Sequence, residues 1–300
     1  MKKKGSVVQL DRISDFGSEG WGFESSLGHK ISLLICICFF SISHSQSIIE
    51  KVKLSKIISE TSGLEYHNDL LVTHNDSGND PSLYYLDYSG KIIHTRKFDG
   101  INNNDWEDLT ADENFIYIAD MGNNFDTREN LMIIKVSKDI YDKNYELIKF
   151  YYPEQSDINF KLKSQFDAEA IITIDEFLLI FTKNREKKIT DIYKIPKKAG
   201  SHAAKKIGSL NTNSIVTGGD YLKDLNLLVL TSTVEFDNYF LLKIDNFDLK
   251  SENNQIKMYE IPIGKTQVEA VKIIDSHNFW LSSENEKNGY PYLYKFSLKD

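Results

Sequence analysis

Cysteine, proline and long apolar runs are scarce in this 300-residue sequence. The two cysteines, Cys36 and Cys38, lie close together, and residues 46–300 contain none, which excludes a disulfide framework there. The apolar run at residues 31–42 is too short to span a bilayer. The sequence shows no sustained helical period and no Gly-x-Ser-x-Gly elbow, Walker loop, His-Glu-x-x-His motif or cysteine-pair zinc motif. These absences exclude several enzyme classes before any activity is suggested.

The apolar run has the length of the hydrophobic region of a signal peptide. Ser43 and Ser45 supply small residues at the −3 and −1 positions of a cleavage site after Ser45. A lipoprotein signal fits less well, because Ile35 and Ile37 stand where a small residue should precede the modified cysteine. We therefore expect residues 29–45 to be a signal peptide and the product to be exported, either to the periplasm or to the extracellular medium.

Residues 1–28 do not fit this signal peptide, because Lys2, Lys3 and Lys4 stand far from the apolar run. The stretch resembles a peptide found at the start of many bacterial gene models in which the reading frame has been extended across a neighbouring transfer-RNA gene. We interpret it as a non-native leader from a mis-assigned start, with translation beginning near residues 29–31. A long natural leader is the alternative.

Charge limits the class of partner. The chain has 36 basic and 44 acidic residues and a net charge of −8. Non-specific nucleic-acid binding depends on neutralising phosphates, so no nucleic-acid partner is expected. An acidic surface suits solubility and cation binding. We expect a small polar ligand or an extracellular partner, and no membrane span in residues 46–300.

A short motif followed by paired apolar strands recurs five times. The copies begin near Ser62, Glu107, Glu169, Gly218 and Glu269, at offsets of 45, 62, 49 and 51 residues. A period near 50 residues built from strands alone is typical of a β-propeller. The sequence therefore predicts one all-β domain over residues 46–300, a propeller of five four-stranded blades.

The fifth repeat is one strand short. An alternating segment, residues 48–57, precedes the first repeat and can serve as the outer strand of the last blade, which closes the ring and leaves no unpaired radial edge. Six blades remain the alternative, because residues 141–166 lengthen one repeat and could hide part of another sheet.

Strand direction alternates within a blade, so the start of each first strand and the end of each second strand lie on the same face. We expect Glu107, Glu169 and Glu269, with Asp120, to surround a divalent cation at the mouth of the central channel. Oxygen ligands of this kind suit Ca²⁺ or Mg²⁺, and Ca²⁺ is the cofactor we expect. The structural alternative is that each Glu caps backbone amides or pairs with a neighbouring basic residue. The other candidate ligand residues at the mouth are His74, Asn75, Asp76, Trp106, Asp108, Asn123, Asn124, Arg128, Lys183, Arg185 and Glu284.

Two of these residues have strong structural alternatives. We expect His74 to be a hydrogen-bonded structural residue more than a general base. Trp106 could stack on a sugar or a base, but packing between blades is the commoner use of a tryptophan.

The second repeat combines Asp105-Trp-Glu-Asp-Leu109 with Asp120-Met-Gly-Asn-Asn124 and then Arg128. This set resembles a group of exported bacterial propellers that carry the same two motifs. The Glu-Ala-Ile/Val motif at Glu169 and Glu269 is more loosely similar to the Glu-Gly-Ile/Leu motif of phytase-like and esterase-like propellers. The looser resemblance implies calcium-dependent phosphohydrolase or lactonase activity.

Two functions follow from these expectations. The first is an exported binding or scaffold propeller with an acidic, calcium-binding channel mouth. The second is a metal-dependent hydrolase of phosphate or lactone esters that uses the same mouth. The first is favoured because no nucleophile–base pair is visible in the sequence. Whether the protein is an enzyme stays open at this point.

Overall fold

Five sheets, each built on four antiparallel strands, form the fold in the computed structural model, which describes residues 46–251, 254–285 and 289–299. Blade 1 contains β2 (Thr61–His67), β3 (Leu70–Asn75), β4 (Ser82–Leu86) and β5 (Ile92–Lys97). Blade 2 contains β6 (Trp106–Ala111), β7 (Phe115–Asp120), β8 (Met132–Ser137) and β9 (Tyr145–Tyr151). Blade 3 contains β10 (Ala168–Ile174), β11 (Phe177–Thr182), β12 (Thr190–Pro196) and β14 (Lys205–Leu210).

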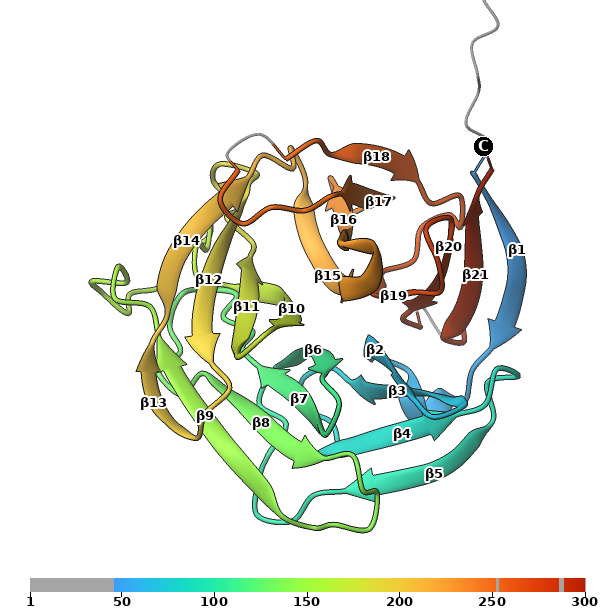
Figure 1. Ribbon diagram of the computed structural model, residues 1–300, viewed down its shortest axis with the longest axis horizontal. Coiled ribbons are helices and arrows are strands. Elements are labelled where there is room, and N and C mark those ends of the chain that lie inside the picture. Colours follow the sequence, from blue (N-terminus) through green and yellow to red (C-terminus); the bar gives the residue numbers. More distant parts are fainter. Residues whose placement is uncertain (1–45, 252–253, 286–288, 300) are drawn as a thin grey trace, which may run out of the picture. The chain divides into compact units, whose positions relative to one another are not determined.

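Blade 4 contains β15 (Ile215–Leu222), β16 (Leu227–Val234), β17 (Asn238–Asp245) and β18 (Lys257–Glu260). Blade 5 contains β19 (Val268–Ile273), β20 (Asn278–Ser283), β21 (Tyr292–Leu298) and, at its outer edge, β1 (Gln46–Lys53). The first strand of every blade lies at the centre of the ring in Figure 1. The predicted five-bladed propeller is therefore confirmed, and residues 152–167 form no strand that could belong to a sixth blade.

The ring closes with the segment that comes first in the described chain. Strand β1 pairs antiparallel with β21, from Gln46 opposite Leu298 to Lys53 opposite Tyr292. Closure by this segment is confirmed, but the strand ends at Lys53. Ser55 then caps a 3-10 helix, Lys56–Ile58, which turns the chain into blade 1.

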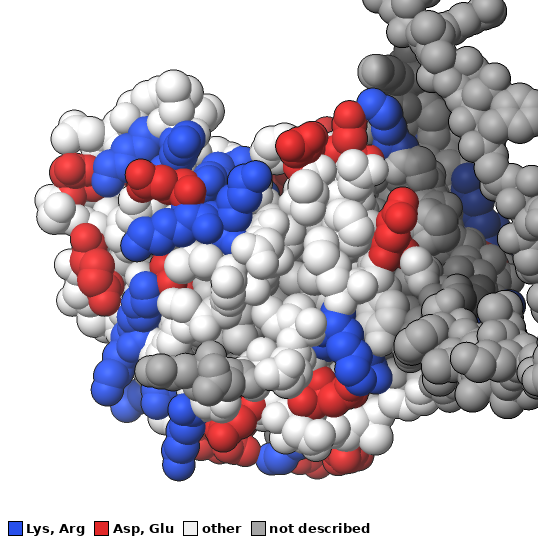
Figure 2. All heavy atoms as spheres, turned by 90° about the horizontal axis from the view of Figure 1, so that it is seen from above, with Lys and Arg blue, Asp and Glu red and all other residues white. Residues whose placement is uncertain are grey.

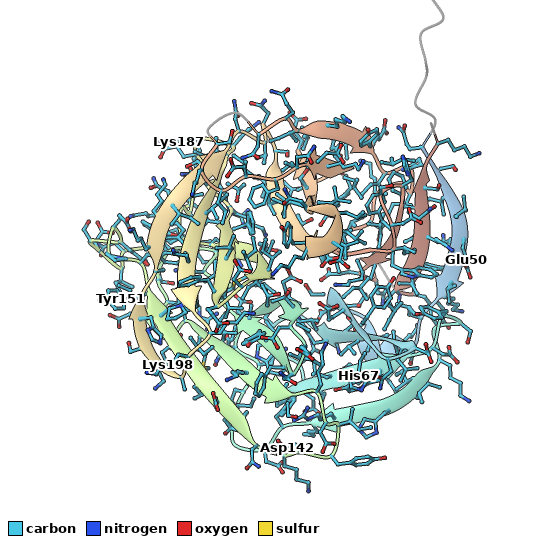
Figure 3. All side chains as sticks on the ribbon, viewed as in Figure 1. Glu50, His67, Asp142, Tyr151, Lys187 and Lys198 are labelled. Atoms are coloured by element: carbon cyan, nitrogen blue, oxygen red, sulfur yellow. The ribbon has the colours of Figure 1, made fainter. Side chains whose placement is uncertain are left out.

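Apolar side chains fill the spaces between blades, because each sheet packs on two neighbours and the alternating side chains of a strand are buried on both faces. Five clusters of buried residues result, one between each pair of adjacent blades. Trp106 is fully buried between blades 1 and 2, as in the packing interpretation. By contrast, Glu50 and Tyr151 on outer strands are exposed, and Figure 3 labels them at the outer rim.

One segment departs from the predicted pattern. After β12, a short turn leads into β13 (Gly200–Ala203), which pairs in parallel with β9. The turn that leaves β12 is therefore followed by a short fifth strand on the neighbouring blade 2. Within the described residues, the only helices are two short 3-10 turns, and none is long and apolar enough to cross a membrane.

Candidate functional site

A β-bulge places the key glutamate in each of three blades. In blade 2, Trp106 pairs with Asp120 and Asp108 pairs with Ala119, so Glu107 between them is left out of the ladder. The same register shift leaves out Glu169 in blade 3 and Glu269 in blade 5. A bulge re-aims the side chain of its extra residue. All three glutamates therefore line one cavity of about 240 Å³ at the mouth of the channel.

Blades 1 and 4 use the equivalent position differently. In blade 4 the register shift leaves out Thr217, so the expected Gly218 is one residue out of register. In blade 1 Ser62 still pairs with His74, and the register shifts only after it, between Ser62 and Glu65. The Thr217 hydroxyl donates to the Val268 carbonyl at 2.6 Å, and the Ser62 hydroxyl donates to the Glu107 carbonyl. At this position blades 1 and 4 contribute hydrogen bonds to neighbouring blades, whereas the other three blades contribute carboxylates.

The mouth cavity, as we call this space, gathers residues from all five blades and their connecting loops. Its lining comprises Ser62, Asp76, Glu107, Asn124, Glu169, Lys183, Arg185, Phe236, Gln267, Glu269 and Glu284. Eight of these residues were expected at the mouth from the sequence: Asp76, Glu107, Asn124, Glu169, Lys183, Arg185, Glu269 and Glu284. The other expected residues lie around the cavity and do not line it.

His74 is one of these surrounding residues and has no access to the mouth cavity. Its side chain is fully buried beside Trp106, and its Nδ1 donates to the Asn75 carbonyl at 2.9 Å. Burial lowers the pKa of His74 to about 4. Asn75 in turn donates to the Ile57 carbonyl at 2.8 Å, which ties the entry segment to blade 1. Both residues therefore serve the structure.

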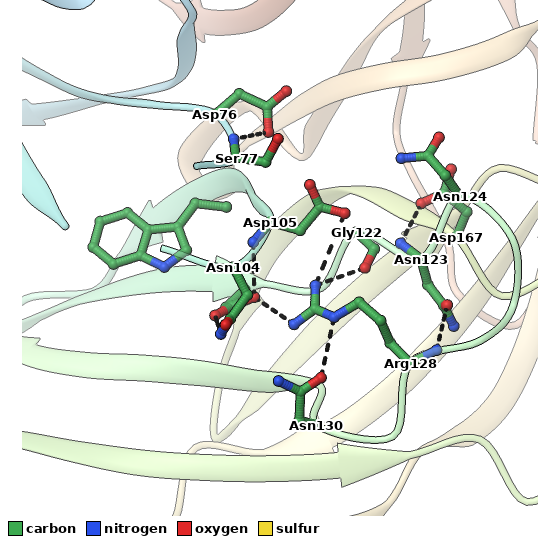
Figure 4. A network of polar contacts seen from close by, with 12 residues as sticks. Asp76, Ser77, Asn104, Asp105, Gly122, Asn123, Asn124, Arg128, Asn130 and Asp167 are labelled. Carbon is green, nitrogen blue, oxygen red and sulfur yellow. Dashed lines mark hydrogen bonds and ion pairs between the residues drawn. The ribbon is translucent and has the colours of Figure 1, made fainter. Parts of the chain in front are cut away.

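Asp120 was expected among the metal ligands but is engaged by the protein itself. Its Oδ1 accepts from Arg128 Nη2 at 2.6 Å, and its Oδ2 accepts from Asn104 Nδ2 at 2.7 Å. Arg128 also donates to the Gly122 carbonyl at 2.6 Å and to Asn130 Oδ1 at 3.2 Å (Figure 4). The residues of the Asp120-Met-Gly-Asn-Asn124 motif thus form a rigid turn around the Arg128 guanidinium.

Asn123 and Asp108 have similar structural roles. The backbone N–H of Asn123 donates to Asp167 at 2.7 Å, while its side-chain oxygen accepts from the backbone of Arg128. The buried Asp108 carboxylate accepts from the backbone N–H of Leu109 at 2.8 Å and of Ile171 in blade 3 at 2.9 Å. Such bonds satisfy buried amides at the junction between blades.

Two groups of three carboxylates converge beside the mouth cavity. Asp76, Asp105 and Glu107 form one group, and Glu107, Asp167 and Glu169 form the other; within each group the nearest carboxylate oxygens lie within 4.8 Å of one another. Glu107 belongs to both groups. Sequence reasoning missed Asp105 and Asp167, although each stands two residues before a bulge glutamate. This repeated Asp-x-Glu spacing was the signal that could have found them.

The carboxylate of Glu107 stands out because it is unpaired among the described residues. Its residue is only 4% exposed, and its carboxylate forms no hydrogen bond or ion pair with the part of the chain that the structure describes. Burial raises its pKa well above the usual range, and the negative charge of Asp76 raises it further. An unpaired buried carboxylate is costly, so this position favours either a proton or a cation.

The pKa values of neighbouring acids are raised for the same reasons. Burial, followed by the charge of Asp76, raises the pKa of Asp105 to about 6 and that of Glu284 to about 8. Burial also raises the pKa of Glu269 well above its usual range. The mouth cavity therefore concentrates carboxylates from four blades in a largely buried space.

Only part of that charge is neutralised by basic residues. Lys183 forms an ion pair with Glu169, in agreement with the structural alternative for this one glutamate. Arg185 Nη2 contacts Asp167 Oδ2 at 2.9 Å and Asn124 Oδ1 at 2.8 Å. Neither cation forms an ion pair with Glu107 or Glu269 among the described residues.

Other basic side chains gather away from the mouth cavity. Figure 2 shows many Lys and Arg side chains over its left half, the side on which Figure 1 shows β12 and β14 of blade 3. These strands carry Lys194, Lys205 and Lys206. None of these three lysines lines the mouth cavity.

A second polar layer lies deeper in the channel. Lys272 of β19 contacts Glu65 of β2 at 2.6 Å and Asp220 of β15 at 2.9 Å. The second oxygen of each acid accepts a backbone N–H from the next blade, Ala111 for Glu65 and Ile273 for Asp220. Every charge in this layer is paired, in contrast to the mouth cavity above it.

Comparisons with known proteins add no functional identification. No family model and no curated protein sequence matches the chain. Similar solved structures include Kuenenia stuttgartiensis hydrazine synthase, at 14% identity and a TM-score of 0.42, with 77% of this chain and 57% of that chain covered. They also include a chain of the mitotic checkpoint complex, at 10% identity and a TM-score of 0.43, with coverages of 85% and 96%. YCF48 from Cyanidioschyzon merolae shows 10% identity and a TM-score of 0.42, with coverages of 84% and 86%.

These likenesses are too distant to carry an argument about function, and the matched region spans little more than half of the hydrazine synthase chain. The fold and the site together define a five-bladed β-propeller with an acidic channel mouth. The expected membership in a group of exported bacterial propellers stays a prediction from the motifs.

Proposed function

We propose that this protein is an exported binding propeller whose mouth cavity holds a divalent cation, Ca²⁺ before others, and through it a polar ligand. The single observation that carries the proposal is the Glu107 carboxylate, which is buried, forms no hydrogen bond or ion pair with the described residues and belongs to two groups of acids. A cation beside Glu107 would remove the cost of burying this charge.

The donor set supports the choice of metal. Both groups consist of carboxylates alone, and hard oxygen ligands favour Ca²⁺ or Mg²⁺ over zinc. Ca²⁺ accepts six to eight ligands in flexible geometry, so three carboxylates leave several coordination positions for water or for oxygen atoms of a ligand. Mg²⁺ requires a stricter octahedron, which suits carboxylates held by different blades less well.

Binding is ranked above hydrolysis because the mouth cavity shows no nucleophile paired with a base: the one hydroxyl among its lining residues, that of Ser62, donates to the Glu107 carbonyl. His74 is buried outside the cavity and bonded to a carbonyl, and Lys183 is held in an ion pair. The alternative function, a metal-dependent hydrolase of phosphate or lactone esters, would use a metal-bound water instead. A panel of phosphoester and lactone substrates, assayed with Ca²⁺ and with chelator, separates these two functions.

Calcium should stabilise the folded protein. A cation that binds only the folded state adds about 2.7 kcal/mol at one hundred times its Kd, which for a domain of this size raises the melting temperature by roughly 5–10 °C. Glu107→Gln should abolish most of this shift, because it removes a charged ligand from both groups while keeping the shape of the side chain. Thermal melts with Ca²⁺ and with chelator provide the measurement.

The matched control is Glu50→Gln, the same change on the exposed outer strand β1, which should leave the calcium shift intact. If the parent protein melts at the same temperature with Ca²⁺ and with chelator, the proposed cation site is rejected.

Export is a separate part of the proposal, because its signals lie in residues 1–45, outside the described residues. Expression in a bacterial host followed by mass spectrometry of the exported fraction should find Gln46 at the N-terminus. Peptides from residues 5–28 recovered from cells that carry the native gene would show that the leader is a natural part of the protein.

A further inference from the structure

We infer that Lys183 is a tethered counter-cation, whose ammonium group competes with a divalent cation for the carboxylates of the mouth cavity and thereby weakens cation binding. The inference rests on the proposed function and deepens it, because it names the residue that sets the affinity of that site.

The backbone places Lys183 at the centre of the acidic groups. It follows directly after β11, and its N–H donates to the Asp167 carbonyl at 2.6 Å. Its side chain is 11% exposed, lines the mouth cavity and pairs with an oxygen of Glu169. Glu169 is also a member of the group formed with Glu107 and Asp167. A cation bound to that group and the Lys183 ammonium would therefore require the same carboxylate.

The charge of Lys183 acts on carboxylates well beyond Glu169. Its electrostatic attraction lowers the pKa of four further acids, which burial raises: Asp76 of blade 1, Glu107 of blade 2, and Glu269 and Glu284 of blade 5. A single ammonium thus partly neutralises acids from four of the five blades. A divalent cation in the same space would supply the same attraction with twice the charge, and the two like charges would repel each other.

The other two cations near the mouth are fixed in place, whereas Lys183 is not. Arg185 is held by the side chains of Asp167, Asn124 and Ser164. Arg128 is held by the side chains of Asp120 and Asn130 and by the Gly122 carbonyl. Lys183 Nζ has a single acceptor, Glu169, among the described residues. A lysine ammonium on a flexible four-carbon stem can leave one partner easily, while a guanidinium held in several directions cannot. Lys183 is therefore the cation that can yield its position to a metal.

The test is calorimetric titration of Ca²⁺ into metal-free parent protein, Lys183→Met and Lys187→Met at one pH and ionic strength. Lys183→Met should bind Ca²⁺ at least about tenfold more tightly than the parent, which corresponds to about 1.4 kcal/mol. Its metal-free form should melt at a lower temperature than the metal-free parent, because the acids lose their internal counter-charge. Lys187→Met removes the same charge from a nearby exposed loop residue, which Figure 3 labels near the outer edge, and should bind like the parent.

A gain in affinity distinguishes competition from a purely structural role, since structural damage would weaken binding. If the parent binds Ca²⁺ and Lys183→Met binds no more tightly, the inference is overturned while the proposed function stands. If neither protein binds Ca²⁺, the proposed function falls and the inference with it. Should Lys183→Met fail to fold, Lys183→Gln, which is neutral but polar, must show the same gain; Lys183→Arg, which keeps the charge, must show none.

Discussion

A chain that begins at Leu54, and so lacks β1, is expected to be roughly 5 kcal/mol less stable than a chain that begins at Gln46. Seven residues of β1 pair with β21, and a ladder hydrogen bond contributes about 1 kcal/mol net. Ile48 and Val52 also pack on buried clusters at blade 5, and the Lys51 ammonium lies 4.0 Å from the ring centre of Tyr292. Because domains are stable by only about 5–15 kcal/mol, this loss is a large part of the total.

Urea denaturation, followed by fluorescence of the buried tryptophans, measures the difference. The shortened chain should also aggregate, since an unpaired β21 edge offers a template for pairing with another molecule. Adding a peptide of residues 46–53 in excess should restore stability and solubility, whereas a scrambled peptide of the same composition should not. Equal denaturation midpoints for the two chains would show that β1 contributes nothing to closure.

The sequence predicted the architecture because a propeller repeats it. Each blade presents the same succession of motif, apolar strand and polar turn, so five weak signals at similar spacing combine into one strong signal. Closure followed from counting strands, since the last blade lacked one and an alternating segment preceded the first. The same topology brought Glu107, Glu169 and Glu269 together, because strand direction alone decides which ends meet at the mouth.

The features that the sequence did not reveal depend on how neighbouring strands and turns align with one another. Gly218 was expected where Thr217 lies, because the bulge in each blade shifts the pairing by one residue and no residue type marks it reliably. Asp120 looked like a metal ligand, but the turn after β7 brings Arg128 back onto it. Strand β13 joins a blade other than its own, an irregular pairing that periodicity cannot predict.

The paired layer below the mouth was also invisible in the sequence. Glu65, Asp220 and Lys272 come from three blades and are separated by long stretches of chain, with no shared motif. Their meeting depends on each occupying the same level of the innermost strand, where they pair with Val72, Val229 and Trp280 of the second strands. In this deeper layer the negative charges are paired with a lysine, whereas the mouth cavity keeps an excess of negative charge.

Lys272→Met is expected to destabilise the protein by about 3–5 kcal/mol, because it leaves the buried carboxylates of Glu65 and Asp220 without their shared counter-charge. Although burial lowers the pKa of Lys272, the two acids raise it above its usual value, so the lysine is charged throughout the neutral range. Methionine keeps most of the side-chain volume, which limits the packing defect. Thermal melts should show a fall of roughly 10 °C at neutral pH.

The pH dependence of that loss separates charge from packing. Burial and the negative charge of Asp220 already raise the pKa of Glu65, and removing the ammonium raises it further. A carboxyl with a raised folded-state pKa destabilises the fold above its unfolded pKa, and this penalty shrinks as pH falls and a proton takes the place of the ammonium. The difference in the free energy of unfolding between the parent and Lys272→Met should therefore narrow at acidic pH.

Adding Glu65→Gln and Asp220→Asn to Lys272→Met should recover part of the lost stability at neutral pH, since no buried charge is then left unpaired. A loss that is constant with pH and unchanged in the triple variant would instead show that Lys272 stabilises the channel through packing alone.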